Sequence, residues 1–403
     1  MLKDYSAPIG KVYADCTEAL LQNIARHFNI SAMGNTGSFE WEAQKLAELG
    51  QLKQENLKII AKMIGDTSGM TELALEQAML DALAKNDDML LKAVQEGLAT
   101  GREVGLSQSM RNALNSYSAQ AVKQQNLVNT VMLNSSVNSY RRVVSNVLKA
   151  QEYLQDVAQG VLNSKTGEVI TGITSRQAAV RSAVKQLADE GITGFVDKAG
   201  KSWTPEAYVN MDIRTTSGNV AREAVFQQCE ESGLDLVIVP VNATARPGCA
   251  PYQGKVLSRS GASGKTTDRN GNSINYSPLS STTYGEPDGL FGINCHHSPP
   301  DPFIPGMSKQ KDKPEPDVAE NYEKQQKQRY FENEVKKSKR EAALYNAAGD
   351  KEAFEKAAKN VKEKTATLKA YTDKEGLTYR GDRVQVYGYG RSEAAKVQWS
   401  TRP

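Results

Sequence analysis

The sequence is poor in cysteine, histidine and aromatic side chains, and it has no long apolar run. Its 403 residues include four cysteines and three histidines, and aromatic residues make up 7% of the chain. The cysteines are widely spread, which excludes the disulfide framework of a small secreted domain and suits a reducing compartment. No stretch approaches the roughly 20 apolar residues of a membrane span, and no secretory signal opens the chain. We therefore expect a protein made in the cytoplasm that has no membrane partner.

The sequence also lacks an excess of positive or of negative charge. The 50 lysines and arginines nearly balance the 47 aspartates and glutamates, which leaves a formal net charge of +3. This balance excludes bulk electrostatic attraction to nucleic acid or to an anionic membrane as the main basis of function. The mean hydropathy of −0.54 indicates a modest core. Part of the helical surface is therefore left for solvent or for protein partners.

Helical periodicity dominates residues 1–163, which we predict to be a helical arm or bundle. Apolar residues spaced three and four apart predict helices over 14–27 and 39–63. Thr71 is placed to cap the next helix with its side-chain oxygen. A longer helix follows, and it carries two narrow apolar stripes separated by a lapse at 134–136. Such stripes favour packing within one chain, and homo-oligomerisation through them is the alternative.

Residues 164–306 mix helix signals with strand and turn signals, and we predict an α+β module there. A Thr-Pro pair at 204–205 predicts the start of a helix or helix pair that continues to residue 232, weakened locally at 217–219. The β-branched run over 234–241 predicts a short strand covered on both faces, which Pro240 either ends or places at a sheet edge. Turn residues at 269–272 predict a β-hairpin.

Two arginines of the predicted helix, Arg214 and Arg222, lie eight residues apart and therefore fall on roughly one face. An arginine fork can hold a phosphate or a carboxylate, but it can equally bridge a helix to the sheet on which the helix packs. We favour the structural interpretation, and an anion clamp is the alternative.

Cysteine and histidine gather in the second half of the module, at Cys249, Cys295, His296 and His297. Three of these residues, Cys249, Cys295 and His297, are candidate zinc ligands, although the segment lacks a C-x2-C pair. An oxidisable contact of the two cysteines and a Cys295–His297 nucleophile pair are further alternatives. We favour side chains that pin loops against the sheet, with no cofactor and no complete catalytic constellation. His27 stands alone and is expected at the surface or at a helix end.

Residues 307–403 open with a charged, proline-containing linker at 308–317. Two stretches dense in Lys, Glu and Gln follow, with a break at 348–350. They predict an antiparallel helical hairpin with a charged exterior. The tail from residue 377 is predicted to be extended and mobile. Contact of the basic helices with DNA is a hypothesis that depends on their composition alone.

Several short motifs occur in a specific order in and around the predicted module. They are GI (191–192), RTT (214–216), GLD (233–235), ARP (245–247), QGK (253–255), GLFGINCHH (289–297) and PFIPG (302–306). With these motifs the chain resembles the phage minor capsid protein 2 family, which is related to the Mu-type phage head morphogenesis proteins. The family-motif residues expected to be structural are Arg214, Thr215, Arg222, Arg246, Pro247, Gln253, Gly254, Lys255, Asn294, Cys295, His297 and Gly306.

The chain departs from the family pattern in two places. The family tends to have a histidine shortly before ARP, where this chain has VNAT at 241–244. It also tends to have a histidine and aromatic residues before QGK, where this chain has APY at 250–252. These departures weaken any metal or catalytic role that depended on those histidines. The resemblance implies a structural component of the head, positioned with the portal and without enzymatic activity.

We therefore predict a mainly α protein with a central α+β module, flanked by a long helical N-terminal arm and a C-terminal helical hairpin. The predicted function is that of a minor capsid protein of a tailed bacteriophage, located in the virion. Its expected partners are the portal protein and the major capsid or scaffolding protein. The alternatives are an enzyme-like module, a hydrolase or transferase that uses Cys295 and His297 with an arginine anion clamp, and a DNA-contacting protein ejected with the genome.

Overall fold

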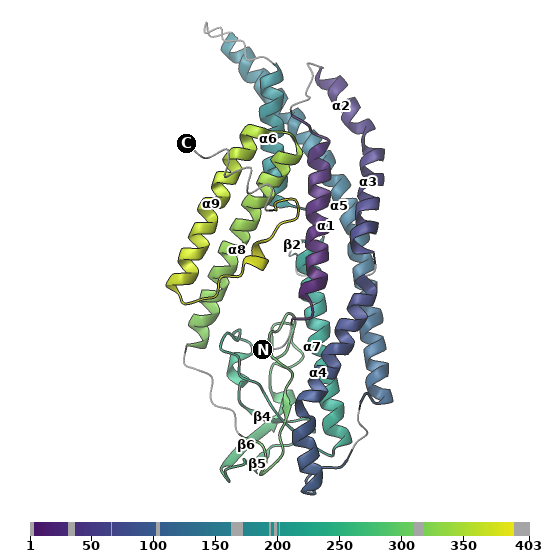
Figure 1. The fold of residues 1–403 in the computed structure, drawn as a ribbon, viewed down its shortest axis with the longest axis vertical. Helices are drawn as coiled ribbons and strands as arrows, with labels where there is room; N and C mark the ends of the chain where they lie inside the picture. Colours follow the sequence, from purple (N-terminus) through teal and green to yellow (C-terminus); the bar gives the residue numbers. More distant parts are fainter. Residues whose placement is uncertain are drawn as a thin grey trace. The chain divides into compact units, whose positions relative to one another are not determined.

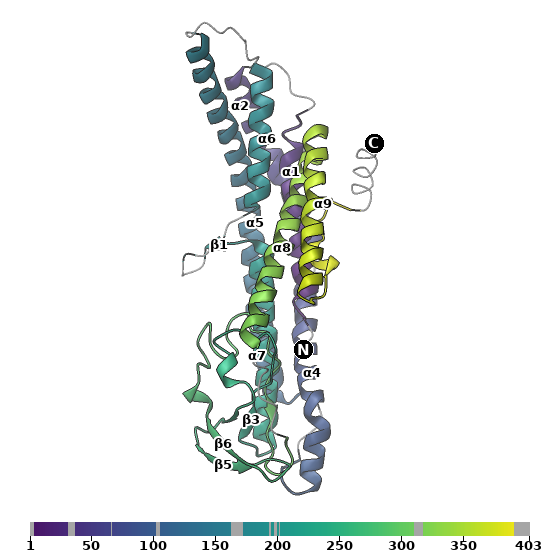
Figure 2. The same ribbon diagram turned by 90° about the vertical axis from the view of Figure 1, so that its left-hand side faces the viewer.

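The computed structural model describes residues 4–30, 37–65, 67–101, 105–162, 172–192, 195–196, 200, 202–309 and 317–390. Most of these residues are helical, and the described strands form a five-stranded and a two-stranded sheet. The fold is therefore mainly α with an α+β module, as the sequence predicts (Figures 1 and 2). Within these ranges no helix combines the length and the apolar content that crossing a membrane requires.

Nine α-helices and three 3-10 helices are found in the described ranges. The α-helices are α1 (Ala7–Arg26), α2 (Ser38–Ala47), α3 (Leu49–Ile64), α4 (Thr67–Gln95), α5 (Gln108–Leu162), α6 (Gly172–Glu190), α7 (Pro205–Glu231), α8 (Val318–Ala347) and α9 (Lys351–Lys374). The 3-10 helices are η1 (Ala250–Tyr252), η2 (Leu279–Ser281) and η3 (Gly381–Val384). The predicted helix that starts with the Thr-Pro pair is α7, a single continuous helix.

The chain divides into two compact units. Unit 1 comprises Met1–Gly10, Asp66–Asn126 and Val209–Gln326, and unit 2 comprises Lys11–Gly65, Leu127–Tyr208 and Lys327–Pro403. Each unit draws residues from all three predicted segments of the chain. The predicted division into residues 1–163, 164–306 and 307–403 follows the order in which helix, strand and charge patterns occur along the sequence. It stays a prediction.

Unit 1 contains a five-stranded sheet with the strand order β5-β6-β4-β3-β7. Its strands are β3 (Leu236–Ile238), β4 (Val256–Ser258), β5 (Gly264–Thr267), β6 (Ser273–Pro278) and β7 (Asp301–Pro302). Strand β3 pairs antiparallel with both of its neighbours, whereas β4 and β6 run parallel. The two-stranded sheet, β1 (Phe195–Val196) with β2 (Ser202–Trp203), is antiparallel.

Strand β3 is buried at every position. Val237 packs into the larger core cluster of unit 1, whereas Leu236 and Ile238 belong to a second cluster that includes Phe303. Because side chains alternate between the two faces of a strand, these memberships show that both faces of β3 are covered. The predicted buried strand is confirmed. It lies between β4 and β7 rather than at a sheet edge, and it ends at Ile238, before Pro240.

The larger core cluster joins the sheet to two helices. Its members on these helices are Ala82, Leu90 and Ala93 of α4 and Ala221, Val225 and Cys229 of α7. The cluster continues into the loop between β6 and β7 through Leu290 and Phe291, and beyond β7 to Ile304. The two helices therefore position the loops that carry the predicted cysteine and histidine cluster.

The predicted hairpin at 269–272 is confirmed as the turn between β5 and β6. The Asp268 carboxylate accepts the backbone N–H groups of Asn270 and Asn272 at 2.9 and 2.8 Å. Gly271 has a φ of 79°, in the left-handed region that favours glycine. The side-chain cap and the glycine together fix the register of the two strands.

Unit 2 is an assembly of helices joined by ion pairs. Arg340 of α8 donates to Glu18 of α1, with 2.8 Å between Nε and Oε1. Arg181 of α6 pairs with Asp350. Asp350 also caps α9, because its carboxylate accepts the N–H of Ala353 at 3.1 Å. The predicted C-terminal hairpin is thus formed by α8 and α9 (Figure 1), and the break between them carries a helix cap.

The tail after α9 packs on this hairpin, so its predicted mobility is wrong for residues 377–390. Val384, only 1% exposed, packs against Val335 of α8 and Leu368 of α9. The backbone carbonyl of Val384 also accepts a hydrogen bond from Lys339 at 2.6 Å. Val384, Tyr379 and Val386 are the apolar side chains of the segment that pack, and they are too few to produce a periodic pattern. Part of the predicted linker at 308–317 lies outside the described residues.

Two helix boundaries in the N-terminal third differ from their predictions. The single helix predicted over 39–63 is interrupted at Glu48, between α2 and α3. Thr71 lies inside α4 rather than at its start, and its hydroxyl donates to the carbonyl of Thr67 at 2.8 Å. Apolar spacing continued across both places, so spacing alone could not find either boundary.

The lapse predicted at 134–136 does not interrupt α5. Ser136 is buried and donates to the Leu133 carbonyl inside the helix at 2.7 Å. Val128, Tyr140 and Val147 on the same helix are fully buried within the chain. For this part of α5, the predicted packing within one chain is confirmed.

Candidate functional site

Three predicted metal ligands meet in unit 1. Cys249 precedes η1, and Cys295 and His297 lie on the loop that leads to β7. The Sγ atoms of the two cysteines are 3.8 Å apart, and Cys295 Sγ is 3.3 Å from His297 Nδ1. All three ligand-type atoms lie within 4.8 Å of one another. Cys249 and His297 are buried, and Cys295 is half-buried.

Close backbone approaches fix the loops around this cluster. At Gly248 a Cβ atom would lie 2.1 Å from the Asp288 carbonyl oxygen. At Gly289 it would lie 2.0 Å from the Thr283 carbonyl oxygen. No side chain fits at such distances, so glycine is required at both positions. Cys249 is therefore held directly against the loop that carries Cys295.

Arg246 ties its own turn to the same loop. Its Nη1 donates to the Ile293 carbonyl and its Nη2 to the Gly289 carbonyl, both at 2.7 Å. Pro247, which follows, is exposed. Two carbonyls bound by one rigid guanidinium fork fix a loop in position and direction. The ARP motif thus anchors the segment that carries Cys295.

Arg214 and Thr215 hold the next part of the loop to α7. Arg214 Nη1 donates to Asn294 Oδ1 at 2.7 Å, and the Asn294 N–H donates to Thr215 Oγ1 at 2.9 Å. Arg214 also pairs with Asp4 at 2.9 Å. Asn294 has a φ of 58°, a left-handed conformation that asparagine tolerates. The RTT motif therefore fixes the turn immediately before Cys295.

Arg222 lies deeper in unit 1. Its guanidinium lies over the Phe291 ring, 5.2 Å from the centroid, and also contacts Asn219. Burial lowers the pKa of Arg222 below its ordinary value. Arg214 contacts Asn294 and Asp4, so the two arginines bind different parts of unit 1. They bridge the helix to the neighbouring loop rather than converging as an anion clamp.

The QGK motif lies beside the cluster. Gln253 is buried, and its Oε1 accepts the backbone N–H of Asn242 and lies 3.4 Å from His297 Nε2. Gly254 has a φ of 71°, and its N–H donates to the Val239 carbonyl at 3.0 Å. Glycine is needed there because the turn requires the left-handed region.

Lys255 and Gly306 occupy more peripheral positions. The Lys255 ammonium lies over the Tyr252 ring, 5.4 Å from its centroid, and its backbone carbonyl accepts the N–H of Val239. Gly306 has a φ of 76°, and its N–H donates to the carbonyl of Thr267 in β5 at 3.0 Å. Both residues close turns of the module, and neither contacts the cysteines in these hydrogen bonds.

The two thiols have opposite proton affinities. A hydrogen bond from the Cys295 thiol lowers the pKa of Cys249 against the effect of burial, and His297 and Arg246 lower it further. The same hydrogen bond, together with burial, raises the pKa of Cys295. The pair therefore favours a thiolate at Cys249 that accepts the Cys295 S–H.

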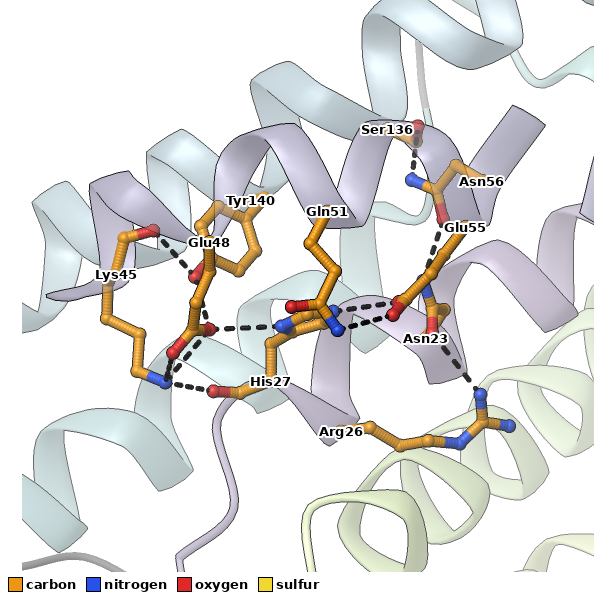
Figure 3. Close-up of polar contacts among 10 residues, drawn as sticks. All are labelled: Asn23, Arg26, His27, Lys45, Glu48, Gln51, Glu55, Asn56, Ser136 and Tyr140. Carbon is orange, nitrogen blue, oxygen red and sulfur yellow. Dashed lines mark hydrogen bonds and ion pairs between the residues drawn. The ribbon is translucent and has the colours of Figure 1, made fainter. Parts of the chain in front are cut away.

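A second polar cluster, which the sequence did not predict, surrounds His27 in unit 2 (Figure 3). Nδ1 of His27 lies 3.0 Å from Glu48 Oε2, and its Nε2 lies 3.0 Å from Glu55 Oε2. The ring therefore bridges Glu48, between α2 and α3, and Glu55 of α3. The ring is only 11% exposed. His27 directly follows α1, so its predicted helix-end position is confirmed, whereas a surface position is wrong.

Further side chains extend this network across four helices, α1, α2, α3 and α5. Asn23 of α1 donates to Asn56 of α3 at 3.0 Å, and Asn56 donates to Ser136 of α5 at 2.9 Å. Tyr140 of α5 donates to the Lys45 carbonyl at 2.9 Å (Figure 3). A chain of buried hydrogen bonds specifies how the helices pair, because a shift in register would leave polar groups unsatisfied. The lapse in the apolar stripe at 134–136 was the only sign of this network in the sequence.

Comparison with known proteins finds similarity to structural proteins of phages. The sequence matches the family described as phage minor capsid protein 2 over residues 1–373. It is also similar to a protein described as a structural protein, from Lactococcus phage LL-H, with 28% identity over 313 residues. That alignment covers 74% of this chain and 76% of the phage protein. No solved structure matches the chain. The family match extends over the helical segments as well as over the loops of the Cys/His cluster.

Proposed function

The chain belongs to the phage minor capsid protein 2 family, and from this membership we propose that it docks at the portal vertex during assembly of the phage head. Its role is that of a structural capsid protein, and its place is the virion. The proposal adds the site of docking, the portal protein as partner, and assembly in the host cytoplasm. Exposed apolar side chains on α4 are the observation that carries it.

Three leucines form a stripe on the exposed surface of α4. Leu73, Leu80 and Leu91 are 68%, 37% and 60% exposed. They are seven and eleven residues apart, and at about 100° per residue they lie within about 20° of one another around the helix. Met70, 38% exposed, lies one turn before the stripe. We call Leu73, Leu80 and Leu91 the α4 stripe.

The other side of α4 is already buried in unit 1. Leu75, Met79, Leu83 and Leu90 are at most 5% exposed. A helix that is apolar on opposite faces is typical of one that is covered on both sides. Burying a leucine side chain contributes roughly 1.5–3 kcal/mol, so the α4 stripe can support a stable contact with a protein partner.

The family description supports the portal as that partner. A capsid protein described as minor is expected in few copies, and a head with one portal has a single vertex that differs from the others. A component that binds the repeating capsid lattice would instead be present at many equivalent positions. A contact formed by one helix face fits a groove between helices of the partner.

Cryo-EM of purified heads, reconstructed without imposed symmetry, tests the proposal. Density for the protein is expected at the portal vertex. The double variant Leu73→Glu, Leu80→Glu is expected to fold but to be depleted from heads at least tenfold, because it places charges in the contact. Leu127→Glu, at a 51% exposed leucine of α5, is the matched control and should be incorporated normally.

Three results would contradict the proposal. Density spread over the capsid lattice would place the protein elsewhere in the head. Normal incorporation of the double variant would show that the α4 stripe takes no part in the contact. Equal depletion of the Leu127→Glu control would show that any added surface charge blocks assembly, and the stripe would then have no specific role.

A further inference from the structure

The geometry of Cys249, Cys295 and His297 matches that of a metal site. Two sulfur ligands of a tetrahedral zinc ion, each about 2.3 Å from the metal, lie about 3.8 Å apart. The two Sγ atoms here are 3.8 Å apart. A sulfur and an imidazole nitrogen on the same ion lie about 3.5–3.6 Å apart, and Cys295 Sγ is 3.3 Å from His297 Nδ1. Bonded sulfurs of a disulfide would be only about 2.05 Å apart.

The orientation of His297 is a second, independent observation. Nδ1 faces the sulfurs, while Nε2 lies 3.4 Å from Gln253 Oε1. Gln253 is itself positioned by the backbone N–H of Asn242, which its Oε1 accepts. A histidine that binds a metal through one nitrogen commonly donates its other N–H to a carbonyl or carboxylate oxygen. Gln253 therefore fixes the tautomer and ring orientation that a metal at Nδ1 requires.

The sulfur atoms also have hydrogen-bond donors around them. The backbone N–H of His297 donates to Cys295 Sγ at 3.4 Å. Arg246, three residues before Cys249, is itself fixed by two loop carbonyls. N–H groups directed at sulfur stabilise thiolate ligands and adjust their basicity. One Zn²⁺ with two thiolates and a neutral imidazole has no net charge, which a largely buried position requires.

We propose that Cys249, Cys295 and His297 bind one zinc ion, through the two Sγ atoms and Nδ1. The fourth position of the tetrahedron falls to a solvent molecule, because Cys295 is only half-buried. The ion links the turn after the ARP motif to the loop at 289–297. Soft thiolate and imidazole donors select zinc over magnesium or calcium, which prefer oxygen ligands.

Metal analysis of the full-length protein tests this assignment directly. Protein purified without chelators is expected to contain about one zinc per chain by mass spectrometry of the native protein and by elemental analysis. After the zinc is replaced by Co²⁺, thiolate-to-cobalt charge-transfer absorption and d–d bands of tetrahedral intensity are expected. These two measurements use the wild-type chain, so they do not depend on whether any variant folds.

Variants then locate the ligands. Cys249→Ser, Cys295→Ser and His297→Gln should each weaken zinc binding at least tenfold in a competition titration. Cys229→Ala is the matched control, because Cys229 is buried in the same core cluster but is absent from the ligand group. Gln253→Ala removes the partner of His297 and should weaken zinc binding by about 10- to 100-fold, as loss of an outer-sphere partner does.

Several outcomes would overturn the assignment. Wild-type protein without zinc, and without a cobalt–thiolate band after reconstitution, would leave the cluster as loop packing. Loss of two hydrogen masses under non-reducing conditions would identify a Cys249–Cys295 disulfide instead. Equal loss of zinc in Cys229→Ala would show that the metal is bound by other thiols or lost by unfolding.

Discussion

Glu48 links more of unit 2 than its position between two helices suggests. Its carboxylate accepts a hydrogen bond from Lys45 at 2.9 Å and one from Tyr140 at 3.1 Å, and it also faces His27. Burial alone would raise the pKa of Glu48, but the hydrogen bonds from Lys45 and His27 lower it below its usual value. The pKa of Glu55 is lowered in the same way, by His27, Gln51 and Asn23 against the effect of burial.

These lowered pKa values predict a loss of stability in acid. The unfolded chain protonates the Glu48 and Glu55 carboxyls near their ordinary pKa of about 4.3, whereas the folded chain keeps them ionised to lower pH. Their contribution is therefore complete above about pH 5 and is lost as the pH falls through the lowered values. We expect the melting temperature of Glu48→Gln to fall less steeply than that of the wild type between about pH 5 and 3.

The same variant has an expected effect at neutral pH. Removing hydrogen bonds to a charged group should lower the free energy of unfolding by roughly 1.5–3 kcal/mol at pH 7. Glu152→Gln, at an exposed position of α5, is the control and should keep the wild-type slope in acid. Identical acid slopes for Glu48→Gln and wild type, measured by circular dichroism, would contradict the linkage.

Helices and strands with regular apolar spacing could be predicted, and their interruptions could not. Other local signals also succeeded: a Thr-Pro start identified α7, a β-branched run identified β3, and charged composition with a break identified the hairpin of α8 and α9. Apolar spacing continued across Glu48, where polar contacts of one side chain accompany the break between α2 and α3. It lapsed at 134–136, where Ser136 is buried because it satisfies Asn56 of a different helix. In both places the side chain bonds to a residue on another helix: Glu48 to Tyr140, and Ser136 to Asn56. Apolar spacing along the sequence carries no information about such contacts.

The candidate site shows the same division. The motifs and the residue types Cys and His were visible in the sequence, but the distances were not. Cys249 and Cys295 are 46 residues apart, and close glycine packing at Gly248 and Gly289 brings their loops together. Arg214 and Arg222 looked equivalent from their spacing, yet only the structure shows that they bind different parts of unit 1.

The segment after α9 offers a test of an element that carries no periodic signal. Val384→Ala should lower the free energy of unfolding by about 2 kcal/mol, because it removes methyl groups from a fully buried contact with Val335 and Leu368. Gln385→Ala, at the exposed neighbouring position, is the control and should change stability by less than about 0.5 kcal/mol. Equal effects in chemical denaturation would show that the segment contributes no packing.

Three apolar clusters of the described residues each lie within one unit. The clusters around the sheet, which include Val237 and Phe303, draw only on unit 1, whereas the cluster of Val335, Leu368 and Val384 draws only on unit 2. Separate cores are expected to open as separate cooperative regions. Local loss of structure around the unit 2 cluster should therefore leave the loops of the proposed zinc site in unit 1 intact.

Arg340→Ala tests this independence. The change removes the guanidinium that pairs with the buried Glu18 carboxylate, and breaking a buried pair in this way costs about 3–5 kcal/mol. Hydrogen exchange measured by mass spectrometry should rise in α1, α9 and the unit 2 part of α8 and stay at the wild-type rate in β3 and β4. Arg142→Ala breaks an exposed pair with Glu190 and is the control. A parallel rise in β3 and β4 would show that the two cores open as one unit.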